Sequence, residues 1–217
     1  MSFSLPNSVR LDRVQQKTIR EYIRNRGLFI CSDFDNLKTT CFKPAERETY
    51  HIHTKSFEVD ADLDQVWNTY LSISPKETWR CRTVSFGCMY CKKSKAITYA
   101  KDEYKGLREG QVLFLNVGLF WGMVNIAVAH QITRIEPVEK YIEFSYIEGG
   151  ETEGSQRLSF SQTSQGTTEI VHKTTYRGKT KSLFREKTLY PILHARVISA
   201  FHWNVKQKVI AGTVSPA

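Results

Sequence analysis

The chain has 217 residues, of which 41% are hydrophobic, and its 31 Lys and Arg against 22 Asp and Glu give a net charge of +9. This length predicts one domain with an additional N-terminal piece, and the basic charge favours acidic partners without indicating a fold. The first residues contain no apolar signal core, the longest apolar run is too short to span a bilayer, and the cysteines number five, so we expect a soluble, cytoplasmic protein with reduced thiols.

Residues 1–49 are expected to form an N-terminal extension. Within it, residues 8–26 are predicted to be a helix, with Asn7 or Ser8 as its N-cap and Gly27 as its stop. Residues 28–48 follow no regular pattern, and Pro44 argues against a continuous element there. The apolar side of the helix would pack on the domain, and the opposite side carries a stripe of basic residues: Arg10, Arg13, Lys17, Arg20 and Arg24.

The next part of the chain reads mainly as strands. A strand is predicted from Tyr50 to Val59, and the acidic run 60–64 then predicts the N-terminus of a helix that carries Val66 and Trp67. A further strand is predicted over 79–86, whereas residues 87–110 indicate no clear element. Alternation predicts five more strands, at 111–117, 124–135, 140–147, 155–163 and 167–177. Strands in unbroken succession favour antiparallel pairing, because parallel neighbours need crossovers.

The longest predicted helix covers residues 191–211. Pro191 suits its first turn and Gly212 its C-terminal end. A helix of about 21 residues spans roughly 30 Å, which is enough to cover one apolar face of a sheet. The predicted fold class is therefore α+β, a helix-grip arrangement in which one curved antiparallel sheet wraps around the C-terminal helix, in a domain spanning residues 50–217.

Two segments resemble a known superfamily. The segment Phe57-Glu-Val-Asp-Ala-Asp-Leu-Asp-Gln-Val-Trp67 resembles the opening of START/Bet v 1-like (SRPBCC) proteins, where a strand leads into a helix with a Val-Trp pair. Residues 144–160 resemble a strand-turn-strand of the DUF1990-like branch, although residues 149–152, Gly-Gly-Glu-Thr, replace the His usual in that turn. The resemblance implies a cavity between sheet and helix. It leaves function open, because the superfamily includes lipid carriers, metabolite binders and cyclases.

Two independent periodicities predict which side chains meet between sheet and helix. Strand alternation turns one set of mainly aromatic residues inward, and the helical period places a second set on one stripe. A mostly apolar lining with a few polar groups suits the binding or transport of a small hydrophobic molecule, lipid or polyketide-like, unless these residues merely fill the core. The predicted ligand-binding residues are Phe144, Tyr146, Gln156, His172, Tyr176, His194, Val197 and Phe201.

Two other functions remain open. The first is a cyclase or hydrolase that uses His172 or His194 of the same cavity as an acid–base group. The second is a basic module for an anionic membrane surface, although charge runs usually only keep a surface solvated. No nucleic-acid-binding motif is present. The basic residues available are the N-terminal stripe and a second run: Arg177, Lys179, Lys181, Arg185 and Lys187.

Cys88 and Cys91 have a C-x-x-C spacing that zinc or redox sites also use. A zinc site needs four ligands, and no second pair follows at a matching spacing. The prediction is that the cysteines are reduced and bind no metal, and no cofactor is expected.

Overall fold

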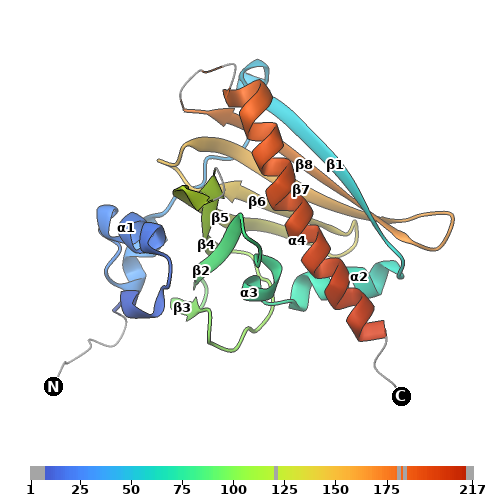
Figure 1. Ribbon diagram of the computed structural model, residues 1–217, viewed down its shortest axis with the longest axis horizontal. Coiled ribbons are helices and arrows are strands. Elements are labelled where there is room, and N and C mark those ends of the chain that lie inside the picture. The colour runs from blue at the N-terminus through green and yellow to red at the C-terminus, as the bar shows by residue number, and fades with distance from the viewer. Residues whose placement is uncertain (1–7, 120–121, 180–181, 183–184, 214–217) are drawn as a thin grey trace.

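The computed structural model describes residues 8–119, 122–179, 182 and 185–213. The eight strands found in these residues belong to one antiparallel sheet, in the order β1-β8-β7-β6-β5-β4-β2-β3 (Figure 1). Their bounds are β1 His51–Val59, β2 Val84–Cys91, β3 Ala96–Tyr99, β4 Gln111–Leu119, β5 Val124–Glu136, β6 Tyr141–Tyr146, β7 Thr152–Gln162 and β8 Thr168–Gly178. The five strands predicted after residue 110 are confirmed to within a few residues.

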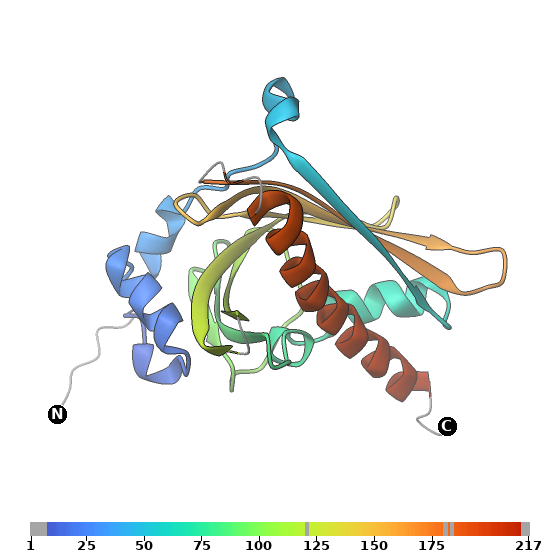
Figure 2. The same cartoon turned by 45° about the horizontal axis from the view of Figure 1, so that its top comes forward.

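The long helix α4, Tyr190–Thr213, crosses the concave side of this sheet (Figures 1 and 2). Its inner stripe includes Ile198, Phe201 and Val205, all buried in the core. A sheet with an apolar face needs a cover, and the apolar stripe of α4 is long enough to supply most of it. The predicted α+β helix-grip fold is confirmed.

Two shorter helices complete the concave side. Asp62 caps α2, Leu63–Ser72, by accepting a 2.8 Å hydrogen bond from the Gln65 backbone N–H. α3, Pro75–Thr78, follows at once, with Ser74 as its N-cap. The strand predicted from residue 79 is therefore wrong at its start: Trp79 ends α3, and β2 begins only at Val84. The physical reason is the pairing of a capping serine with a first-turn proline, which starts a new helical turn.

The N-terminal helix is shorter than the predicted 8–26. α1 spans only Lys17–Asn25, after a 3-10 turn at Leu11–Arg13 and an extended stretch. Ser8 is bridged to Ile30, and the Val9 N–H donates to the carbonyl of Phe29, so tertiary pairing holds this start in an extended form. Asn7 lies outside the described residues. Gly27, with a φ of +66°, follows the helix end as expected.

The extension covers the convex side of the sheet at β2, β4 and β5, opposite α4 (Figure 2). Two 3-10 segments, Cys31–Asn36 and Pro44–Thr49, occupy the region without a regular pattern. Ile19, Ile23 and Phe34 pack against the outward side chains of β2 and β4 and form a second core. The division of the chain at residue 49 stays a prediction. Among the described residues, no helix is both long and apolar enough to span a bilayer.

Candidate ligand cavity

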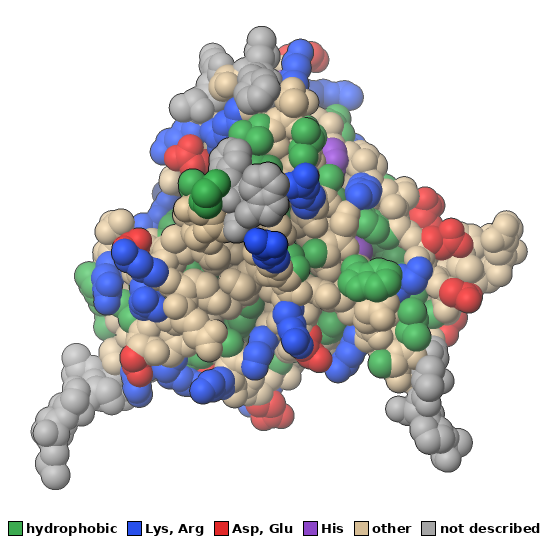
Figure 3. Space-filling view, in the orientation of Figure 1, with side chains coloured by type: hydrophobic (Ala, Val, Ile, Leu, Met, Phe, Trp, Pro, Cys, Tyr) green, Lys and Arg blue, Asp and Glu red, His purple; other side chains and the backbone are tan. Residues whose placement is uncertain are grey.

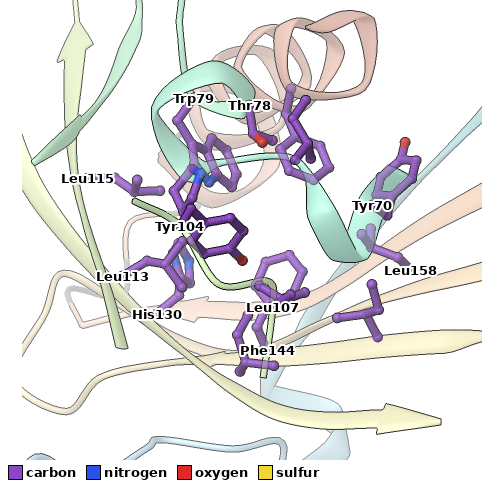
Figure 4. A pocket seen from close by; sticks show the side chains of 15 residues that line it. Tyr70, Thr78, Trp79, Tyr104, Leu107, Leu113, Leu115, His130, Phe144 and Leu158 are labelled. Carbon is purple, nitrogen blue, oxygen red and sulfur yellow. The ribbon is translucent and has the colours of Figure 1, made fainter. Parts of the chain in front are cut away.

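A small cavity lies between the inner face of the sheet and the helices α2, α3 and α4 (Figure 4). The centres of water molecules can occupy about 50 Å³ of its volume, which is room for a few waters. Leu113 and Leu115 of β4, Phe144 of β6, Phe201 of α4 and Trp79 supply much of its wall. The wall is therefore mainly aliphatic and aromatic, with few polar groups.

Gln156 of β7 is the centre of a buried polar cluster beside this wall. Its amide Nε2 donates to the Tyr146 hydroxyl at 3.0 Å and contacts Nε2 of His130 at 3.1 Å. Its Oε1 lies 2.8 Å from Nε2 of His172 and 3.3 Å from Nε2 of His194. Both ends of the amide are thus satisfied, as a group only 4% exposed requires.

A chain of hydrogen bonds continues from Gln156 to α2. His172 Nδ1 lies 2.9 Å from His202 Nε2, and His202 Nδ1 is hydrogen-bonded to the Tyr70 hydroxyl. His172 is fully buried and His202 is 2% exposed. The chain therefore joins β7, β8, α4 and α2 through side chains alone.

The positions of the protons follow from chemistry. A carbonyl oxygen only accepts and an amide N–H only donates, so His172 donates through Nε2 to Gln156, and His130 accepts through Nε2. A neutral imidazole carries one proton, so His172 accepts at Nδ1 from His202 Nε2–H, and His202 accepts at Nδ1 from Tyr70. At the other end, the His130 proton must be on Nδ1.

This last N–H is buried without a partner. His130 is 8% exposed and lines the cavity, and its Nδ1 makes no hydrogen bond within the described part of the chain. Tyr104 also lines the cavity, and its hydroxyl is likewise buried and unpaired within the described residues; Figure 4 labels it among the lining side chains. A buried polar group left unpaired costs about 1–3 kcal/mol. The cavity thus has an apolar wall and two free hydrogen-bonding groups.

Burial keeps this cluster uncharged. Loss of hydration lowers the pKa of His130 to about 3, and loss of hydration together with repulsion from His53 and His130 lowers the pKa of His194 to about 3. The same loss of hydration holds the pKa of His172 and that of His202 well below the ordinary value, together with repulsion from nearby imidazoles for His172 and from Lys55 and His194 for His202. The imidazoles are therefore neutral at physiological pH.

A second branch of the cluster reaches the start of α4. The Tyr146 hydroxyl is hydrogen-bonded to that of Tyr190, whose ring stacks on Tyr176 at a centroid distance of 3.8 Å. His194 Nδ1 lies 3.2 Å from Nδ1 of His53 on β1. Desolvation raises the pKa of Tyr176 to about 12, so this branch is also neutral.

The structure places the eight predicted ligand-binding residues on the inner side, in three different settings. Phe144 and Phe201 line the cavity, and Val197 lines a neighbouring groove. The other five belong to the polar cluster rather than to the cavity wall: Tyr146, Gln156, His172, Tyr176 and His194. Their role in ligand binding stays a prediction.

Sequence reasoning missed most of the cavity wall. His202 follows Phe201 and lies close to the predicted helical stripe, so the helical period could have included it. His130 shares one side of its strand with Ile132, which alternation could have shown. Tyr104 lies in an irregular segment after β3, where no period applies.

The two cysteines of the C-x-x-C spacing lie on strand β2. On a strand, residues three apart point to opposite faces, and Cys88 packs toward the extension while its neighbour Met89 faces the inner core. Cys91 is on the Met89 side. The spacing therefore cannot join these thiols on one metal, and no cluster of metal ligands is found in the described ranges.

Much of the basic charge is paired locally. Arg13 is paired with Asp102, and Arg177 lies between Glu46 and Glu153. Further pairs join Arg10 to Asp12, Lys17 to Glu21 and Arg185 to Glu151. Lys181 lies outside the described residues. These pairs hold only part of the predicted basic runs, since no ion pair with a described residue involves Arg20, Arg24, Lys179 or Lys187.

Comparisons with known proteins identify the fold but no closer relationship. No family model matches the chain, and a search of curated proteins finds no match. The DUF1990-like branch therefore stays an expectation.

Several solved structures share the architecture. Norcoclaurine synthase from Thalictrum flavum aligns at a TM-score of 0.53 with 13% identity, over 78% of this chain and 92% of that one. Major latex-like protein 151 from Panax ginseng gives 0.51 with 11% identity, over 74% and 97%. Protein TTHA0849 from Thermus thermophilus gives 0.54 with 10% identity, over 75% and 99%. The chain therefore has the START/Bet v 1-like helix-grip fold.

Proposed function

We propose that this protein binds a small, largely apolar ligand in the cavity between the sheet and α4, without converting it. The observation that carries the proposal is the unpaired His130 Nδ1–H. Every other imidazole nitrogen from Tyr70 to Gln156 along the buried chain has a partner, so this donor is the open end of an otherwise completed set. The ligand accordingly carries a hydrogen-bond acceptor, such as a carbonyl oxygen.

The size of the cavity limits what enters it. Drug-sized ligands occupy sites of roughly 300–1,000 Å³, far more than the present cavity. The part of the ligand beside His130 is therefore a small polar group with a few carbons, and larger ligands must part the walls or extend outward. The resemblance to the START/Bet v 1-like superfamily implies a fold that lipid carriers and metabolite binders also have. This shared fold supports a binding function but does not specify the ligand.

The test is binding of the neutral fluorophore N-phenyl-1-naphthylamine, together with native mass spectrometry of the purified protein for a retained ligand. Phe201→Trp adds bulk to the cavity wall and should abolish fluorophore binding while the protein stays folded. Ile192→Trp is the matched control, because Ile192 is half-exposed on the same helix; it should bind as the unaltered chain does. Equal binding by both variants, or no binding by the unaltered chain, would contradict the proposal.

The second candidate is an enzyme that uses the buried histidines as acid–base groups. A solved norcoclaurine synthase structure contains a transition-state analogue, so this fold supports catalysis in that protein. General acid–base groups work best with a pKa near the operating pH, whereas burial lowers the pKa of His130 and His194 to about 3. The electrostatics of the cavity therefore favour binding over catalysis.

A further inference from the structure

A groove lies between the end of β4 and α4, where its lining residues follow those of the cavity along both elements. Its volume is about 250 Å³, close to the lower limit for small-molecule sites. Val117 and Leu119 of β4 and Leu193 and Val197 of α4 form its apolar walls. The groove is thus larger than the cavity and similarly apolar inside.

The groove and the cavity follow one apolar path. Val117 lies two residues after Leu115 on the inner side of β4, and Val197 lies one helical turn before Phe201 on α4. Leu115 and Phe201 belong to the cavity wall, whereas Val117 and Val197 belong to the groove. An extended ligand could therefore occupy the groove with its apolar end between these side chains.

Two arginines also line the groove. Arg82 comes from the segment before β2 and Arg196 from α4, and both are exposed. Neither makes an ion pair or side-chain hydrogen bond with any described residue, in contrast to Arg13 and Arg177, which are held by carboxylates. Figure 3 shows Lys and Arg side chains across the centre of the face that carries α4, with acidic side chains mainly toward its edges.

Apolar walls beside two free guanidinium groups fit one kind of ligand. A guanidinium binds a carboxylate through two parallel hydrogen bonds, and the apolar walls accept a hydrocarbon chain. The volume suits one chain rather than the two chains of a membrane phospholipid. We propose that the groove binds the anionic head group of a single-chain amphiphile, a carboxylate held by Arg82 and Arg196, with the chain directed toward the cavity. This inference rests on the proposed function, because it assigns the outer end of the same ligand.

The experiment compares dodecanoate with dodecanol as competitors of N-phenyl-1-naphthylamine, at low salt and below their micelle-forming concentrations. The two differ only in the head group. The unaltered protein should bind dodecanoate about tenfold more tightly, and added salt should reduce this preference. In Arg82→Gln/Arg196→Gln the preference should fall to about one. The matched control, Arg24→Gln/Arg47→Gln, removes the same charge at exposed arginines without a side-chain partner in the described structure and should keep the preference.

The outcomes separate this inference from the proposed function. Equal binding of the two competitors by the unaltered protein would overturn the head-group site and leave the cavity proposal intact. Binding of neither would contradict the proposed function itself. A preference that persists in Arg82→Gln/Arg196→Gln would also overturn the site. So would binding to phosphatidylglycerol vesicles that needs these arginines while dodecanoate shows no preference, because the arginines would then serve a membrane surface.

Discussion

The two faces of the sheet are buried in different ways. On the convex face, Phe34 packs on Tyr90 and Phe114, with ring centroids 5.0 and 5.6 Å apart, and the Tyr90 hydroxyl donates to Asp35. On the concave face lie a cavity and the polar cluster that contains all of the buried histidines. Buried polar atoms without a partner in the described structure occur on both faces, at His130 on the concave side and at Gln131 on the convex side. The convex face is therefore closely packed by aromatic side chains, whereas the concave face contains unfilled space and a buried cluster of polar side chains.

The largest expected effect contrasts two phenylalanines of the same sheet. Phe114→Ala on the convex face should lower the free energy of unfolding by about 3–5 kcal/mol, because it empties a closely packed core. Phe144→Ala should cost less, because Phe144 already borders empty space. Chemical denaturation measures both. An equal cost would show that the concave face is as tightly packed as the convex one.

The next effect concerns pH. His172 and His202 stay neutral when folded but titrate near 6.5 when unfolded, so below pH 6.5 the unfolded chain binds more protons. Stability therefore falls as pH falls through this window, by about 3 kcal/mol between pH 6.5 and 5 for the two together. Denaturation curves at these pH values test it. Unchanged stability would mean that the histidines become protonated within the fold, contrary to their burial.

A smaller effect is expected from a substitution that alters the packing of the convex face alone. A methyl group on Gly87 would lie 2.3 Å from the Ile19 side chain, so Gly87→Ala should cost about 1–3 kcal/mol through overpacking. Ligand binding on the other side of the sheet should persist in the folded protein. Thermal unfolding and N-phenyl-1-naphthylamine titration measure the two effects separately. Loss of binding at full stability would show that the faces are coupled.

The smallest expected effect concerns the unpaired His130 donor on the concave face. His130→Leu removes the unpaired donor and should weaken a ligand with a carbonyl group about tenfold, the worth of roughly 1.4 kcal/mol. 2-Dodecanone and dodecane, as competitors of the same fluorophore, are suitable probes. Dodecane should bind the variant as well as before, because it forms no hydrogen bond with His130. The substitution also removes the acceptor of one Gln156 amide N–H, which affects both probes equally. Equal weakening of both probes would exclude a hydrogen bond from His130.

The order of the elements could be read from the chain because local rules decide it. Asp62 caps α2 in the way residue preference predicts, and alternation located the strands after residue 110. The start of the extension could not be read in this way, since its bridge to Ile30 joins residues distant in sequence. The cavity was predicted only in part, because its wall also uses Tyr104 from a segment without any period.

By itself, the sequence determined the α+β class, the long C-terminal helix and part of the set of inward aromatic and polar side chains. Periodicity does this because each residue's direction depends on its own element alone. Only the tertiary structure decided which of these side chains border space and which satisfy each other. Whether Gln156 has a partner, or His130 lacks one, depends on atoms from four elements meeting within about 3 Å, and no local pattern encodes that meeting.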